Sequence, residues 1–121
     1  MGTPEWLGKL FDTIDNKDAD GFVAFLTEDA TFTFGNADPV QGKTAIKELL
    51  IGFFGSIKAI RHEILDVWTH PDAVISRGTV TYTRHDSSTL TVPFANIFKM
   101  ENNLVREYLI YVDTSQLYAG A

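Results

Sequence analysis

A chain of 121 residues has the length of one domain, because a second domain would be too small to bury its own core. Hydrophobic residues make up 45% and charged residues 21%, which excludes intrinsic disorder over most of the chain. Sixteen acidic residues against ten basic ones give a net charge of -6, and the basic residues form no cluster. We therefore expect a single domain over residues 1–121 that binds neither nucleic acids nor an anionic membrane surface.

The chain contains no cysteine, which excludes disulfides, thiolate metal sites and a cysteine nucleophile. This composition fits a reducing compartment. The first residues show no basic segment followed by an apolar one, as a secretory signal would. The longest uncharged run, residues 87–98, is interrupted by Pro93 and is too short for a membrane-spanning helix. We expect a cytoplasmic protein.

The N-terminal half predicts helices on either side of a short strand. The first helix begins at Pro4 with Thr3 as its N-cap, and its apolar residues fall on one face. A second, short helix follows Asp18, whose carboxylate can cap it. The alternating residues 29–34 predict a strand, and residues 35–42 predict a loop.

A third helix is predicted from Lys43 to a stop near Gly55. Its apolar residues repeat at i, i+3, i+4, i+7 and i+8, which is the spacing of an amphipathic stripe. These residues are Ile46, Leu49, Leu50, Phe53 and Phe54. The stripe predicts that this helix packs against the rest of the fold along one side.

Beyond Ile57 the hydrophobic period changes from 3.6 to 2 residues, which predicts four strands. They span about 58–69, 73–84, 89–100 and 104–113. The breaks between them are short and polar, as in an antiparallel meander. The strands are long, so the sheet can twist and curl around the third helix into a cone with a mouth. The predicted fold is α+β, with three N-terminal helices packed in a strongly curved, mostly antiparallel sheet.

Alternation along the strands predicts which side chains face the inside of this cone. A bulge near Pro93 would move Phe94 to the other face, so the register there is open. The interior is apolar with a few polar groups, which is the composition of a site for a small apolar ligand. The predicted inner set is Phe32, Phe34, His62, Ile64, Val74, Ser76, Gly78, Val80, Tyr82, Val92, Phe94, Asn96, Phe98, Leu109, Tyr111 and Asp113.

Several local strings, in this order, resemble the SnoaL-like polyketide cyclases of the nuclear transport factor 2-like superfamily. The strings are Asp20-Gly21, Leu26-Thr-Glu-Asp-Ala-Thr31, Val40-Gln-Gly-Lys-Thr-Ala-Ile46, Val92-Pro-Phe-Ala-Asn-Ile-Phe98 and Ile110-Tyr-Val-Asp113. The resemblance covers nearly the whole chain. It implies a cystatin-like cone, commonly dimeric, that is shared with ketosteroid isomerases and limonene-epoxide hydrolases.

The resemblance also indicates which chemistry is lost. The oxyanion-binding tyrosine of ketosteroid isomerases falls on Leu10, and their general-base aspartate falls on Phe34. Their second, protonated aspartate falls near Asn96. Two of the three roles are lost, so we do not expect steroid isomerisation.

The pattern of limonene-epoxide hydrolases is likewise reduced to one residue. Their arginine and aspartate fall on Gly78 and Val80, and their water-holding tyrosine and asparagine fall on Phe32 and Phe34. The aspartate that ends their last strand is retained as Asp113, where the acid/base aspartate of SnoaL-like cyclases also falls. We do not expect a typical epoxide hydrolase.

Asp113 is the foremost candidate for catalysis, because a carboxylate that lines an apolar cone has a raised pKa suited to proton transfer. The alternative is that Asp113 caps a terminal helical turn. His62 can pair with Asp113 or bind a ligand, or it is a histidine bonded to backbone groups. Asn96 and Tyr82 can donate to a ligand carbonyl, or they serve the core alone.

The remaining predicted contacts with a ligand are Phe32, Phe34, Tyr111 and Leu10. We expect no cofactor and no metal, since His62, Asp66 and His70 lie four residues apart on a strand, about 13 Å from one to the next. The predicted function is cofactor-free acid/base catalysis on an apolar or polyketide-like carbonyl compound. The alternative is a non-catalytic ligand-binding or structural cone. A homodimer through the outer face of the sheet is expected.

Overall fold

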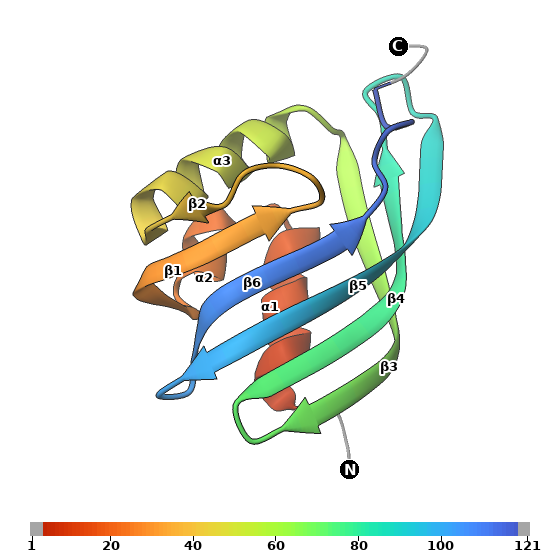
Figure 1. Cartoon of the computed structure of the whole chain (residues 1–121). Helices are drawn as coiled ribbons and strands as arrows, with labels where there is room; N and C mark the ends of the chain where they lie inside the picture. Colours follow the sequence, from red (N-terminus) through yellow and green to blue (C-terminus); the bar gives the residue numbers. More distant parts are fainter. Residues whose placement is uncertain (1–3, 119–121) are drawn as a thin grey trace.

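The computed structural model describes residues 4–118 and has an α+β architecture, with the helices on one face of a single curved sheet (Figure 1). Helix α1 spans Glu5–Asp15, α2 spans Ala19–Val23 and α3 spans Lys43–Gly55. Pro4 is the N-cap of α1 and not its first helical residue, while the predicted cap Thr3 lies outside the described residues. The predicted cap of α2 is confirmed, because the Gly21 N–H donates to Asp18 Oδ1 over 2.9 Å.

The sheet has six strands in the order β2-β1-β6-β5-β4-β3. Strands β3 to β6 form the predicted antiparallel meander, while β1 pairs in parallel with β6. The strands are β1 (Leu26–Phe34), β2 (Val40–Gln41), β3 (Ala59–His70), β4 (Ala73–Thr83), β5 (Thr89–Glu101) and β6 (Leu104–Val112). Within residues 4–118, no helix is long and apolar enough to cross a membrane.

A close approach of two backbones accompanies the irregularity between β3 and β4. The pairing register shifts between Ile64 and Asp66, opposite Gly78. A Cβ atom at Gly78 would lie 1.9 Å from the Glu63 carbonyl oxygen, so only glycine allows the two strands to approach this closely. Bulges of this kind increase local twist and bend a strand, which contributes to the curvature of the sheet.

The bulge considered near Pro93 does not form, so Phe94 keeps its inward orientation. Pro93 pairs with Thr79 in the regular β4–β5 register, and the β5–β6 shift lies at Lys99/Met100 instead. The described β5–β6 ladder ends at Phe94. Pro93, which has no N–H to donate, thus stands just beyond the part of β5 that pairs on both sides.

The predicted inner faces of β4 and β5 are confirmed, and that of β6 is wrong. Val74, Ser76, Val80, Tyr82, Phe94, Asn96 and Phe98 are all buried. On β6 the inner residues are Tyr108, Ile110 and Val112, which pair with Phe98, Asn96 and Phe94. Tyr111 is 55% exposed on the opposite face. Both faces of β6 carry large apolar side chains, so alternation alone could not choose between them, and pairing with β5 decides.

Candidate functional site

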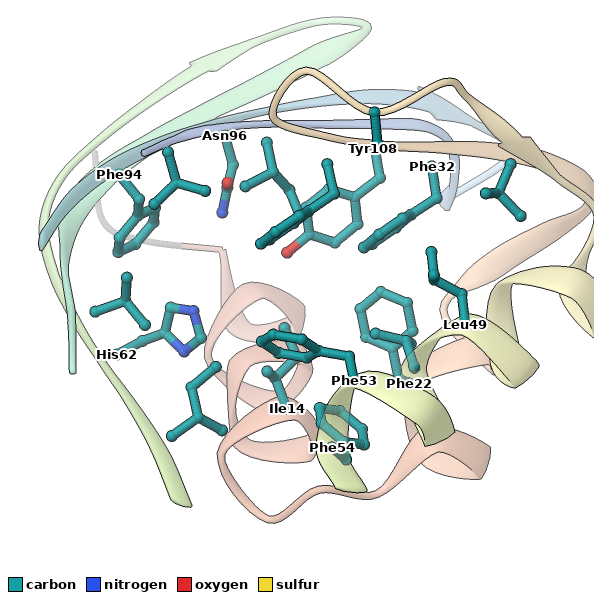
Figure 2. Close-up of a pocket in the computed structure, with 18 of the residues that line it drawn as sticks. Ile14, Phe22, Phe32, Leu49, Phe53, Phe54, His62, Phe94, Asn96 and Tyr108 are labelled. Atoms are coloured by element: carbon teal, nitrogen blue, oxygen red, sulfur yellow. The ribbon is translucent and has the colours of Figure 1, made fainter. Parts of the chain in front are cut away.

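The concave side of the sheet encloses a cavity of about 170 Å³ between the helices and β1, β3, β4, β5 and β6. Most of the side chains around it are aromatic or aliphatic (Figure 2). The predicted residues Phe32, Phe34, His62, Tyr82 and Asn96 all lie in the lining. The remaining aromatic lining residues are Phe22, Phe53, Phe54, Phe94 and Tyr108.

The cavity opens between the β1–β2 loop and α3. Ala37, Asp38 and Leu49 are the solvent-exposed residues of the lining, and the other lining residues are buried or half-buried. Leu49 is 41% exposed although it belongs to the apolar stripe of α3. Its place at the opening explains why an apolar residue of this stripe stays accessible to solvent.

The most organised polar contact at the cavity joins the last residue of α1 to β3. The ring Nδ1 of His62 lies 2.7 Å from Asp15 Oδ1, and the His62 backbone N–H donates to Asp15 Oδ2 over 3.1 Å. The two side chains are only 11% and 26% exposed. One carboxylate therefore fixes both the backbone and the ring of His62.

Asp15 was not among the predicted site residues, although the sequence holds a signal for it. A carboxylate at the C-terminal end of a helix faces the negative end of the helix dipole, which is unfavourable without a partner. Asp15 occupies this position on α1 and finds its partner 47 residues later, in His62. An acidic residue that ends a helix is thus a reason to search for a distant donor.

The contact with Asp15 determines what His62 can offer to a ligand. When Nδ1 donates its proton to the carboxylate, the neutral ring carries its lone pair on Nε2. The ring packs between Phe11 and Phe94, with centroid distances of 4.8 and 5.2 Å. No side chain or backbone group within residues 4–118 forms a hydrogen bond with Nε2. His62 is therefore oriented and available as a proton acceptor at the cavity wall.

Hydrogen-bond donors face the same space. Figure 2 shows the amide of Asn96 and the hydroxyl of Tyr108 pointing into the cavity from the sheet, with the His62 ring nearby. Burial raises the pKa of Tyr82 to about 12, and the nearby Tyr118 adds to the shift. Burial raises the pKa of Tyr108 still further, with added repulsion from Asp15 and Tyr82. Both phenols thus keep their protons near neutral pH and can donate.

Within residues 4–118, two buried side-chain polar atoms have no hydrogen-bond partner. Ser76 and Asn96 are opposite each other on β4 and β5, and they are 0% and 2% exposed. Neither Ser76 Oγ nor Asn96 Oδ1 accepts or donates a hydrogen bond within the described part of the chain. Unpartnered polar atoms of this kind are rare in protein interiors, and here they lie at or beside the cavity wall.

The structure corrects the prediction for Asp113. Its side chain is exposed and lines a second groove, beside Pro93 and Tyr111, and not the cavity. Its pKa is lowered and not raised, because the backbone N–H and the hydroxyl of Ser115 stabilise the carboxylate. Asp113 Oδ1 accepts from the Ser115 N–H over 2.9 Å, which is the contact expected of a capping residue. His62 has Asp15 as its carboxylate partner in place of Asp113.

Two predicted ligand contacts also lie elsewhere. Tyr111 lines the second groove together with Asp113. Leu10 is fully buried in the core and does not reach the cavity. Within residues 4–118, no three His, Asp or Glu side chains gather in a way that could hold a metal ion.

Comparison with known proteins gives the family. The model of the SnoaL-like domain matches residues 7–108. No curated protein matches the chain in sequence.

Three solved structures with the same fold are distant from this chain in sequence. A protein from Jannaschia sp. CCS1 assigned as a SnoaL-like polyketide cyclase has 16% identity and a TM-score of 0.81, over 93% of this chain and 86% of that one. An LEH-like epoxide hydrolase from M. tuberculosis has 16% identity and a TM-score of 0.78, over 94% and 84%. A protein with a ketosteroid isomerase-like fold from Catenulispora acidiphila, solved with trimethylamine, has 13% identity and a TM-score of 0.84, over 91% and 86%. With a family match over most of its length, the chain belongs to the SnoaL-like domain family.

Proposed function

We propose that this protein catalyses proton transfer on a carbonyl compound held in the cavity, without a cofactor. The observation that carries the proposal is the His62–Asp15 pair, which places an oriented imidazole in the wall of an apolar cavity. Solved proteins of this fold include an LEH-like epoxide hydrolase and one assigned as a polyketide cyclase, which supports small-molecule chemistry in such a cone.

The proposed step begins with His62. Its Nε2 accepts a proton from the carbon next to the carbonyl group, and Asp15 stabilises the imidazolium that forms. The electron pair of the broken C–H bond forms the C=C bond of an enolate, and the π pair of the carbonyl group moves onto its oxygen. Asn96 and Tyr108 donate hydrogen bonds to that oxygen in a site with little water. Return of the proton to the same or another carbon completes an exchange or an isomerisation.

Hydrogen–deuterium exchange provides the test. Simple aryl ketones are incubated with the protein in deuterated buffer, and deuterium uptake next to the carbonyl is followed by NMR. We expect exchange above background with the wild type and a loss of about 10²- to 10⁴-fold with His62→Gln. His70→Gln is the matched control, because His70 is an exposed histidine near the end of the same strand.

Equal exchange by wild type and His62→Gln would overturn the proposed role of His62. Binding of ketones without any exchange by the wild type would favour the alternative, a binding protein without turnover. His70→Gln should match the wild type in both binding and exchange.

We also propose that the protein forms a homodimer through the outer face of the sheet. Trp68, Ile75, Ile97 and Leu109 pair successively from β3 to β6, so they form one apolar row across four strands. Trp68 is 53% and Ile75 is 38% exposed. The row contains no charged residue, although each chain has a net charge of -6. Two copies can therefore bury it without placing like charges opposite each other.

A further inference from the structure

The cavity has two chemically different ends. In Figure 2, His62 and Asn96 lie on one side, while Phe22, Phe32 and Leu49 lie on the other. The second side is where the cavity opens, since Leu49 is among its exposed residues. A ligand that enters past Leu49 thus meets aromatic walls first and hydrogen-bonding groups last.

The size of the cavity limits the ligand. About 170 Å³ is close to the roughly 150 Å³ of an engineered cavity that binds benzene. Phe53 narrows the space, with its ring 5.7 Å from that of Phe34 and 6.1 Å from that of Tyr82. A six-membered ring with a short substituent fits such a space, whereas fused rings need a neighbour to move.

The charge of the lining limits the ligand further. Within residues 4–118, the lining contains no Lys or Arg; Asp38 at the opening is its acidic member, and Tyr82 and Tyr108 stay neutral beside His62. Asp15 adds a negative charge behind the His62 ring. A carboxylate would lose its hydration and find no cation, which is strongly unfavourable. The donors Asn96 and Tyr108 instead suit an uncharged oxygen acceptor.

From these observations we infer that the cavity selects a neutral, single-ring compound with one carbonyl group, bound with the ring near Phe32 and Phe53 and the oxygen toward Asn96 and Tyr108. This inference rests on the proposed function only for the role of His62. Ligand selection itself is a property of binding and can be measured without turnover. It excludes free carboxylic acids and fused polycyclic ketones as preferred ligands.

Four probes separate the contributions of ring size, acceptor and charge: acetophenone, ethylbenzene, benzoate and 2-acetylnaphthalene. Dissociation constants are measured by ligand-observed NMR with the full chain at neutral pH. Acetophenone is expected to bind most tightly, and ethylbenzene about threefold to tenfold less tightly because it lacks the acceptor. Benzoate and 2-acetylnaphthalene are expected to bind at least about tenfold less tightly than acetophenone.

Variants then test the size limit. Phe53→Ala should enlarge the cavity and improve binding of 2-acetylnaphthalene by about tenfold relative to acetophenone. Phe25→Ala is the matched control, because Phe25 is a half-buried aromatic residue outside the lining. It should leave the preference unchanged. If Phe53→Ala does not fold, the order of the four probes on the wild type still decides.

Tighter binding of benzoate or of 2-acetylnaphthalene by the wild type would overturn the inference, whatever the result of the exchange experiment. Conversely, acetophenone binding in the expected order without deuterium exchange would overturn only the proposed function. The two failures are therefore distinguishable.

Discussion

Asp15→Asn is the most informative perturbation of the site, because it keeps the shape of the side chain while changing which protons it can accept. In the wild type, the carboxylate accepts from both the ring and the backbone N–H of His62. An amide has one acceptor oxygen, and the backbone N–H of His62 can only donate, so the amide oxygen must remain opposite that N–H. The amide nitrogen then faces Nδ1 and donates to it. This moves the ring proton to Nε2, where the base is needed.

The magnitudes follow from these two contacts. A hydrogen bond to a charged group contributes about 1.5–3 kcal/mol when the partners are largely buried. Asp15→Asn replaces charged acceptors by neutral groups and should lower the free energy of unfolding by about 1 kcal/mol. Asp15→Ala removes both contacts and leaves a β3 N–H unpaired, for a loss of about 3 kcal/mol. Deuterium exchange should fall by about 10²-fold or more in both variants.

Urea unfolding and the exchange assay are run on Asp15→Asn, His62→Gln and the double variant. Coupling predicts that the double variant loses less stability and less activity than the sum of the two single losses. Acetophenone binding should change by only a few fold in Asp15→Asn, since the donors to the carbonyl are intact. Wild-type exchange by Asp15→Asn, or simple additivity in both measurements, would refute the proposed role of the pair.

Three further outcomes are expected. Neutral Tyr82 stabilises the fold below its unfolded pKa of 10.0, and this contribution is lost as the pH rises through about 12. In Tyr82→Phe the contribution is absent, so the free energy of unfolding, measured with urea, should fall by about 3 kcal/mol less at alkaline pH than in the wild type. Asp113→Asn should leave deuterium exchange unchanged, because Asp113 lies outside the cavity; a large loss would return it to the site. Light scattering should give a dimer for the wild type and a monomer for Ile75→Asp, and a wild-type monomer at micromolar concentration would contradict the proposed interface.

Much of the fold was predictable because hydrophobic alternation and helical spacing are local signals. The meander is a good example, since its polar breaks separate strands whose bounds fall close to those predicted. On β4 the choice of inner face was also local, because Arg77 and three threonines occupy the other face. On β6 it was not, since Tyr108 and Tyr111 fall on opposite faces and each face also carries one charged residue, Arg106 or Glu107.

The candidate site was predicted only in part because its central contact is not local. His62, Tyr82 and Asn96 follow from strand alternation, and all three line the cavity. Asp15 is fixed by the packing of α1 on β3, which no strand pattern describes. Asp113 looked favourable because the resemblance aligned it with a catalytic aspartate, but it follows the end of β6 and does not line the cavity.

Asn96 connects the stability of the fold with its proposed use. Its Oδ1 is buried without a partner, which costs about 1–3 kcal/mol in the free protein. A leucine has the same number and branching of side-chain heavy atoms and no polar atom, so Asn96→Leu should raise the free energy of unfolding by about that amount. The same substitution removes one of the two donors to the ligand oxygen and leaves Tyr108, so the preference for acetophenone over ethylbenzene should shrink. A variant that is both more stable and less discriminating would mean that Asn96 is retained for recognition at the expense of stability. Lower stability of Asn96→Leu would instead show that the amide supports the core, and unchanged discrimination would remove it from the binding site.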